Sequence, residues 1–300
     1  MLQGKFAHLH VHSEFSLLDG ANRIKELPIR AKELGMDAIA ITDHGVMFGA
    51  IDFYKACKEN GIKPIIGCEV YVAPRKMTDK DPMIDNKYNH LILLAKNNDG
   101  YKNLIKLVSL GFTDGFYYKP RIDKDVLERY HEGIVCSSAC LAGEIASKIS
   151  AGDIEGAKES AMWFKNLFGD DYYLEIQNNG IKEQVLVNQK LIQIARELNI
   201  PLLATNDSHY LRKEDAYNHE VLLCIQTGKK MSDEDRMRFE TDELYVKSPE
   251  EMIEYFKNVP DAIENTVKVA EKCNVDFEFG HTILPNYDVP EEYQTHFDYL

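Results

Sequence analysis

The chain has 300 residues, 44% of them hydrophobic, and a formal net charge of −14. This size allows a substantial core, and one main domain is expected. The acidic charge argues against strong non-specific nucleic-acid binding by this chain alone, because such binding requires Lys and Arg to neutralise phosphates. No apolar stretch approaches the roughly 20 residues that span a bilayer, and the N-terminus lacks a signal-sequence pattern. We therefore expect a cytoplasmic protein with no membrane partner.

Apolar runs and helical patterns alternate along the chain. The segment 6–12 alternates with period two, as a strand does. Further strands are expected at 37–42, 63–71, 89–95, 133–138, 172–177 and 201–205. Helices are expected at 24–34, 47–60, 99–110, 141–150, 153–168, 183–198, 213–227 and 260–273. This order predicts an α/β fold with a largely parallel sheet, and seven strands favour a barrel surrounded by helices. The segment 73–86 reads as a loop beside the site, either a lid or a solvated loop.

Nine side chains with metal-binding chemistry lie at or near the ends of these apolar runs. They are His10, His12, Asp19, His44, Glu69, His90, Cys140, Asp207 and His209. A barrel brings such scattered residues together, because it builds one pocket from many strand ends. The pattern therefore predicts a site for more than one metal.

The period-two alternation places His8, His10 and His12 on one face of the first strand. We expect His10 and His12 to reach one ion, and His8 to lie a layer deeper in a supporting or core role. Asp207 and His209 share a face in the same way. A lone histidine is more often structural than a metal ligand, but the joint pattern reverses that judgement.

Several other residues admit two interpretations. Asp43 either supports a ligand by a hydrogen bond or forms a turn. Lys119, Arg121 and Arg212 either guide phosphates or are simply solvated. Four histidines without partners are expected to be structural or exposed, namely His131, His219, His281 and His296. The six cysteines have no framework spacing, so free thiols in a reducing compartment are expected.

The ligand chemistry narrows the choice of metal. Imidazole, carboxylate and thiolate together suit Zn, Mn or Fe better than Mg or Ca, which prefer oxygen ligands. We expect two or three divalent metals, with Zn or Mn preferred and Mg or Fe as alternatives. Glu69 could bridge two ions, the arrangement that activates water in phosphoester hydrolysis. Glu69, Asp207 and His12 are therefore the residues expected to carry catalysis.

Several segments together resemble one family. They are 8–13 (HLHVHS), 15–20 (FSLLDG), 42–45 (TDHG), 48–50 (FGA), 61–67 (GIKPIIG) and 204–210 (ATNDSHY). The chain resembles the PHP (polymerase and histidinol phosphatase) domain of bacterial replicative DNA polymerase III alpha subunits, over about the first 280 residues. The absence of an inserted exonuclease favours the shorter type of alpha subunit.

This resemblance implies a distorted seven-stranded barrel with up to three metals in a cleft at one end. It implies a PHP domain over 1–280 and a linker toward the polymerase region over 281–300. It also implies the ligand groups. His10, His12, Glu69 and Asp207 would hold one metal, Glu69, His90 and Cys140 a second, and Asp19, His44 and His209 a third.

Two functions follow from the resemblance. In the first, the domain is a metal-dependent phosphoesterase, most plausibly a 3′-to-5′ proofreading exonuclease that acts on a DNA 3′ end. In the second, it is a catalytically silent, metal-stabilised module that docks a separate proofreading exonuclease subunit. The expected partners are the rest of the polymerase chain and other replisome subunits, with DNA polymerase activity belonging to the full-length chain. A free-standing enzyme similar to histidinol phosphatase is a weaker third reading.

Overall fold

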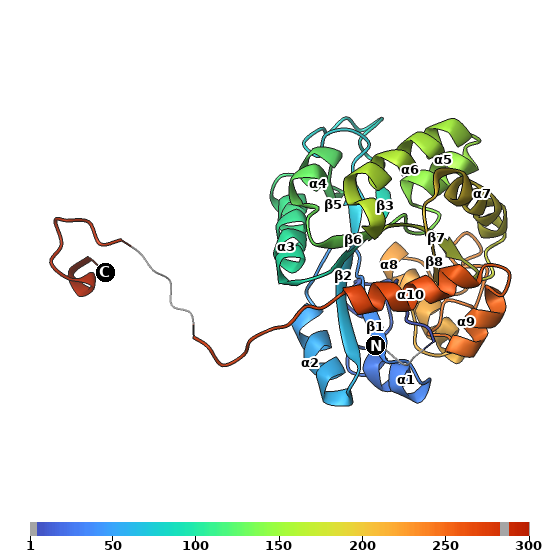
Figure 1. The fold of residues 1–300 in the computed structure, drawn as a ribbon, viewed down its shortest axis with the longest axis horizontal. Coiled ribbons are helices and arrows are strands. Elements are labelled where there is room, and N and C mark those ends of the chain that lie inside the picture. The colour runs from blue at the N-terminus through green and yellow to red at the C-terminus, as the bar shows by residue number, and fades with distance from the viewer. Residues whose placement is uncertain (1–4, 283–287, 300) are drawn as a thin grey trace.

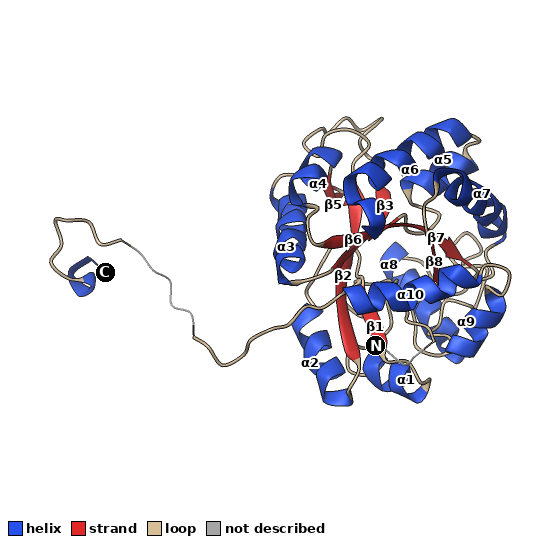
Figure 2. Cartoon of the chain, viewed as in Figure 1, coloured by secondary structure: helices blue, strands red, loops and turns tan. Residues whose placement is uncertain are grey.

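The computed structural model describes residues 5–282 and 288–299 of the chain. Helices surround a central sheet (Figures 1 and 2). The strands are β1 (Ala38–Ile41), β2 (Lys63–Val72), β3 (Asn89–Ala95), β4 (Phe116–Tyr117), β5 (Lys119–Ile122), β6 (Ile134–Ser137), β7 (Tyr172–Gln177) and β8 (Leu202–Thr205). The helices of the first half are α1 (Leu27–Glu33), α2 (Ala50–Asn60), α3 (Asn98–Thr113), α4 (Lys124–Tyr130) and α5 (Glu144–Ser150). Those of the second half are α6 (Ile154–Phe168), α7 (Lys182–Leu198), α8 (Ala216–Thr227), α9 (Pro249–Tyr255), α10 (Pro260–Lys272) and α11 (His296–Tyr299).

The sheet runs in the order β4-β5-β2-β3-β6-β7-β8, and β1 pairs with β2. The first predicted strand, 6–12, forms only isolated bridges, but these connect the two ends of the curled sheet. His8 pairs with Ile39 of β1, and Val11 pairs with Ser208 just after β8. The seven expected strands therefore follow one another around the site, as the predicted distorted barrel requires.

Strand direction differs from the prediction of a largely parallel sheet. β3 runs antiparallel to both neighbours, β2 and β6, whereas the β1–β2, β6–β7 and β7–β8 pairs are parallel. No helix separates β2 from β3, and a parallel pair needs a crossover connection that the intervening loop does not supply. The sheet is mixed for that reason.

The interior of the curled sheet is apolar at the end opposite the candidate ligands. Ala7, Leu9, Ile65, Leu94 and Leu203 pack together there with further buried apolar side chains. Helix α10 adds Val269, Ala270 and Cys273 to this cluster, and it crosses that region in Figure 1. Apolar packing thus fixes one end of the sheet and leaves the other end for polar side chains.

Arg121 is fully buried, so the expectation that it guides phosphates or is solvated is wrong. Its guanidinium group donates hydrogen bonds to the backbone carbonyls of Gly115, Asp85, Met77 and Asp79. These bonds tie the loop 73–86 to the β4–β5 hairpin. The loop is therefore anchored at several points by one buried cation.

No helix within the described ranges is long and apolar enough to cross a membrane. The predicted linker over 281–300 includes residues 283–287, which lie outside the described residues. The domain boundary at residue 280 stays a prediction.

Replacing Arg121 by Met should lower the free energy of unfolding by about 3 kcal/mol or more, because several buried carbonyls would lose a charged donor. Urea denaturation of the variant and of the parent protein measures this loss. Arg129→Ala is the matched control, since Arg129 is exposed, bonds to the Asp125 carbonyl and lies over the neighbouring Tyr130 ring. Equal stability of the Arg121 variant and the parent would contradict this role.

Candidate metal centre

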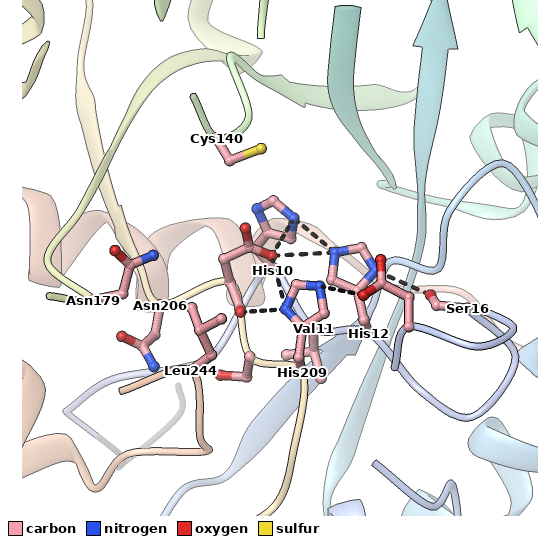
Figure 3. A network of polar contacts seen from close by, with 12 residues as sticks. His10, Val11, His12, Ser16, Cys140, Asn179, Asn206, His209 and Leu244 are labelled. Carbon is pink, nitrogen blue, oxygen red and sulfur yellow. Dashed lines mark hydrogen bonds and ion pairs between the residues drawn. The ribbon is translucent and has the colours of Figure 1, made fainter. Parts of the chain in front are cut away.

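The structure brings all nine predicted ligands to one end of the sheet. Three overlapping groups have ligand atoms within 4.8 Å of one another: His10, His12 and Glu69; His44, Glu69 and His90; and His12, His44 and His209. Asp19, Cys140 and Asp207 contact these groups. His10, His12 and His209 lie together in Figure 3, which also labels Cys140.

Glu69 is central to the cluster and is fully buried. Its Oε1 lies 3.2 Å from His10 Nε2, 3.0 Å from His90 Nδ1 and 3.9 Å from Cys140 Sγ. Its Oε2 lies 2.5 Å from His44 Nδ1 and 3.7 Å from His12 Nε2. The two oxygens thus face different sets of ligands, as a bridging carboxylate would.

The chain after β8 supplies a second carboxylate, Asp207, which is half-buried. Asp207 Oδ1 lies 3.1 Å from His10 Nε2 and 3.2 Å from His12 Nε2. Asp207 has φ of 53°, in the left-handed region that a residue with a side chain seldom adopts. Ala139, directly before Cys140, has φ of 61°. Both turns redirect the chain at the site, and such strain clusters at functional positions.

Hydrogen bonds orient two of the imidazoles toward the site. His10 Nδ1 lies 2.7 Å from the Glu175 carboxylate and donates to it, so that Nε2 would present its lone pair when a metal replaces the second proton. His12 Nδ1 lies 3.0 Å from Ser16 Oγ, whose hydroxyl donates to the Asp43 carboxylate. Figure 3 shows the His12–Ser16 contact. Asp43 therefore supports His12 through Ser16, which is one of the two roles expected for it.

Glu175 was missed by sequence reasoning because it lies inside the apolar run that forms β7. It is 1% exposed and accepts hydrogen bonds from Ser137, Thr205 and Gln177 as well as His10. A charged residue in the middle of a buried strand was the available signal, because such a charge needs partners.

His219 was also missed. It was expected to be structural or exposed, yet it is buried and its Nε2 lies 3.7 Å from Asp19 Oδ1. Asp19 Oδ2 lies 3.0 Å from His44 Nε2, and Asp19 Oδ1 lies 3.8 Å from His209 Nε2. Three imidazoles therefore surround the Asp19 carboxylate.

The other uncertain residues lie outside the cluster. His8 Nε2 contacts the Lys247 carbonyl at 2.9 Å, and the chain bends at His10, so the strict period-two alternation of the first strand is interrupted. Arg212 pairs with Glu33 on the surface. Lys119 lines a hollow beside the cluster. The side chain of His296 lies outside the described residues.

The electrostatics of the cluster fit a bound cation. Burial lowers the pKa of His10, and Asp207, Glu175 and Glu69 raise it to a net value well above the ordinary one. Burial raises the pKa of Glu69, and His90, His44 and His10 lower it to a net value well below the usual range. Positive charge is thus strongly favoured in this site.

Unsatisfied atoms support the same conclusion. Glu69 Oε2, Asp207 Oδ1 and Asp19 Oδ1 are buried and receive no well-directed hydrogen bond within the described part of the chain. The Nε2 atoms of His10 and His12 lie 3.1 Å apart. Buried carboxylate oxygens crowded against converging imidazole nitrogens are costly unless a cation or shared protons lie between them. The donor set therefore fits divalent metals, and its mixture of nitrogen, oxygen and sulphur is borderline-soft.

A cavity of about 300 Å³ adjoins the cluster. Glu69, His90, Cys140 and Asp207 line its polar side, and Met237 and Phe239 line part of its apolar side. A ligand could therefore approach the candidate metal ligands from this cavity.

Comparison with known proteins agrees with this geometry. Residues 8–179 match the PHP domain family, so the chain belongs to that family. It is 52% identical to the DNA polymerase III subunit alpha of Borreliella burgdorferi, over 99% of this chain and 26% of that protein. It is 45% identical to the corresponding subunit of Treponema pallidum, over 100% of this chain and 26% of that protein.

The chain thus spans about a quarter of the length of these curated relatives, to which it is homologous. Among solved structures, a two-domain protein from Bacteroides vulgatus, described as containing a predicted PHP-like metal-dependent phosphoesterase, matches with a TM-score of 0.41. The two proteins are 15% identical, over 89% of this chain and 69% of that one.

Metal binding should release protons at pH 7. Burial lowers the pKa of His44, but Glu69 and Asp19 raise it to a net value of about 10, so the metal-free imidazole is charged at neutral pH. A metal must displace this proton, and the affinity should therefore rise as the pH increases toward 10. Calorimetric titration with Zn in buffers of different ionisation enthalpy measures the release. No proton release on Zn binding, or the same release by the His44→Gln variant, would contradict the assignment of His44 as a metal ligand.

Replacing Glu175 by Gln should weaken metal binding about 10- to 100-fold, because His10 would lose the carboxylate that fixes its tautomer and basicity. Competition with a chromogenic chelator measures the affinity. Glu144→Gln is the control, since Glu144 bonds to Lys124 and Lys148 and belongs to none of the three ligand groups. Equal effects of the two substitutions would show that Glu175 has no specific role.

Proposed function

We propose that this domain is a metal-dependent phosphoesterase that acts on a DNA 3′ end as a 3′-to-5′ exonuclease within a DNA polymerase III alpha subunit. The observation that carries the proposal is the placement of Glu69. Its two buried oxygens face two sets of ligand atoms, which is the arrangement of a carboxylate shared by two ions. Membership of the PHP family and the similarity to alpha subunits support the same class of activity.

The proposed ligand groups are those that the family resemblance implies, and short contacts around Glu69 and Asp19 support them. One metal would be held by His10, His12, Glu69 and Asp207, a second by Glu69, His90 and Cys140, and a third by Asp19, His44 and His209. Zn or Mn suits this mixture of ligands better than Mg. When bound, such metals lower the pKa of a coordinated water and polarise a phosphoryl oxygen.

The chain's own residues would position this chemistry. Glu175 holds His10, and the Asp43–Ser16 pair holds His12, so both Nε2 atoms face Asp207. Burial and the nearby carboxylates Glu69 and Asp207 raise the pKa of the Cys140 thiol well above its ordinary value. Cys140 would therefore become a thiolate only when a cation is bound beside it. No serine or cysteine nucleophile is needed in this scheme.

In the full-length protein the domain would serve a larger enzyme. DNA-directed DNA polymerase activity, association with the rest of the polymerase chain, and contact with a proofreading exonuclease subunit or other replisome subunits are proposed on the basis of the homologous alpha subunits. We further propose that residues 1–280 form the PHP domain and that 281–300 form a linker.

Hydrolysis by the purified chain tests the function. A single-stranded DNA with a labelled 3′ end should lose nucleotides after loading with Mn or Zn, and more slowly with Mg. Glu69→Ala and His12→Ala should each lower the rate by more than about 100-fold, since they remove ligands rather than supporting residues. Arg212→Ala is the control and should keep nearly the parent rate.

Metal content is measured on the same samples by elemental analysis. More than one metal per chain is expected in the parent, and less in Glu69→Ala. A fully metallated parent without any cleavage that these substitutions abolish, across several diesters and monoesters, would favour the silent docking module instead.

A further inference from the structure

A second hollow, of about 450 Å³, lies beside the candidate metal centre. Asp19, His44 and His90 line its inner end. Its wall contains six aromatic side chains: Phe15, Tyr71, Tyr88, Phe112, Phe116 and Tyr118. The volume lies within the roughly 300–1,000 Å³ range of small-ligand pockets. The metal centre and an aromatic surface thus share one continuous lining.

The inner aromatic rings lie directly against the candidate ligands. Tyr71 is stacked on His44, with ring centroids 6.1 Å apart and planes at 15°. The rings of Tyr88 and His90 are nearly parallel, with an interplanar angle of 4° and centroids 6.1 Å apart. Tyr71 packs edge to face against Tyr88, with ring centroids 4.9 Å apart. Tyr71 and Tyr88 therefore continue the lining of the hollow from His44 and His90.

The outer rings belong to the end of α3 and to the β4–β5 hairpin. Phe112, Phe116 and Tyr118 are 42%, 48% and 68% exposed, which is unusual for neighbouring large aromatic side chains. Tyr118, at the hairpin turn, has φ of 60°. A bulky residue in that conformation is strained, and such strain is maintained where the surroundings impose it.

The hairpin is held rigidly. The buried Arg121 donates from Nε to the Gly115 carbonyl at 3.2 Å. A side chain at Gly115 would collide with the Arg121 carbonyl, because its Cβ would lie 1.8 Å away. The backbone on either side of Phe116 and Tyr118 is therefore closely packed, and the two exposed rings project from a fixed support.

One cation accompanies these rings. Lys119 lines the same hollow, and its Nζ lies 5.5 Å from the centre of the Tyr71 ring. Among the described residues, Lys119 forms no ion pair with a carboxylate. Its charge is therefore available to an anion that enters the hollow.

We propose that this hollow binds the terminal bases of single-stranded DNA, with Phe116 and Tyr118 stacking on bases and Lys119 contacting a backbone phosphate. Aromatic rings beside an available cation are the combination that holds single strands without sequence preference. The proposal rests on the proposed function and names its substrate-binding subsite. It also accounts for substrate capture by an acidic chain, because the contacts are local and largely stacking.

Binding can be measured separately from cleavage. The probe is a short single-stranded DNA with 2-aminopurine at its 3′ end and phosphorothioate linkages, which keep the backbone charge and resist hydrolysis, added to the Mn-loaded chain. Stacking should quench the 2-aminopurine fluorescence. Tyr118→Ala and Phe116→Ala should each weaken binding by about 10-fold or more and reduce the quenching. Phe48→Ala is the matched control, because Phe48 is 63% exposed and does not line the hollow.

A second probe with an abasic 3′ end should bind weakly and equally to the parent and the variants. Parent-like binding and quenching by both Tyr118→Ala and Phe116→Ala would overturn the subsite. An equal loss of binding in Phe48→Ala would overturn it too. Quenched binding without cleavage of ordinary DNA would refute the proposed exonuclease and leave the subsite intact. Cleavage of ordinary DNA together with binding that neither Tyr118→Ala nor Phe116→Ala weakens would refute the subsite alone.

Discussion

The organisation of this domain depends on the buried carboxylate of Glu69, whose partners come from several separate parts of the chain. An ionised carboxylate removed from water is costly unless it is paired, and here imidazoles from separate parts of the chain surround it. Asp207 lies against the same His10 and His12. The two carboxylates favour positive charge among the converging imidazole nitrogens, and a bound cation would supply that charge in place of the imidazole protons. Folding and metal binding are therefore expected to be coupled.

The sheet is built so that Glu69 can occupy this position. β2 is the longest strand; β1 pairs with its first half, and β3 and β5 pair with its second half. Glu69 lies in the region where β1 has ended and His44 continues the pairing through a single bridge. A candidate ligand thus comes from within a strand as well as from strand ends. The apolar cluster under α10 closes the opposite end, so only the polar end remains open to ligands.

The sequence predicted the seven strand segments and the nine clustered side chains, because both depend on local apolar runs with polar residues at their ends. It failed where tertiary contacts decide. The β4–β5 hairpin is too short to give a periodic signal, and α4 and α9 are only two turns long. Arg121 resembled a solvated charge, but four carbonyls bury it. Glu175 was hidden inside an apolar run, since a partner 165 residues away gives it its role.

In the proposed function, the two hollows that meet at the cluster would divide the tasks of a nuclease between them. One contains Glu69, Cys140 and Asp207, and the other contains the exposed rings and Lys119, while Asp19, His44 and His90 border both. A strand bound along the aromatic hollow would therefore present its terminal phosphodiester at the shared border. With a net charge of −14, the chain cannot attract that phosphate by its overall field. The bound metals would supply most of the local positive charge, so their removal would abolish catalysis and weaken the hold on the phosphate, whereas stacking on the aromatic rings would remain.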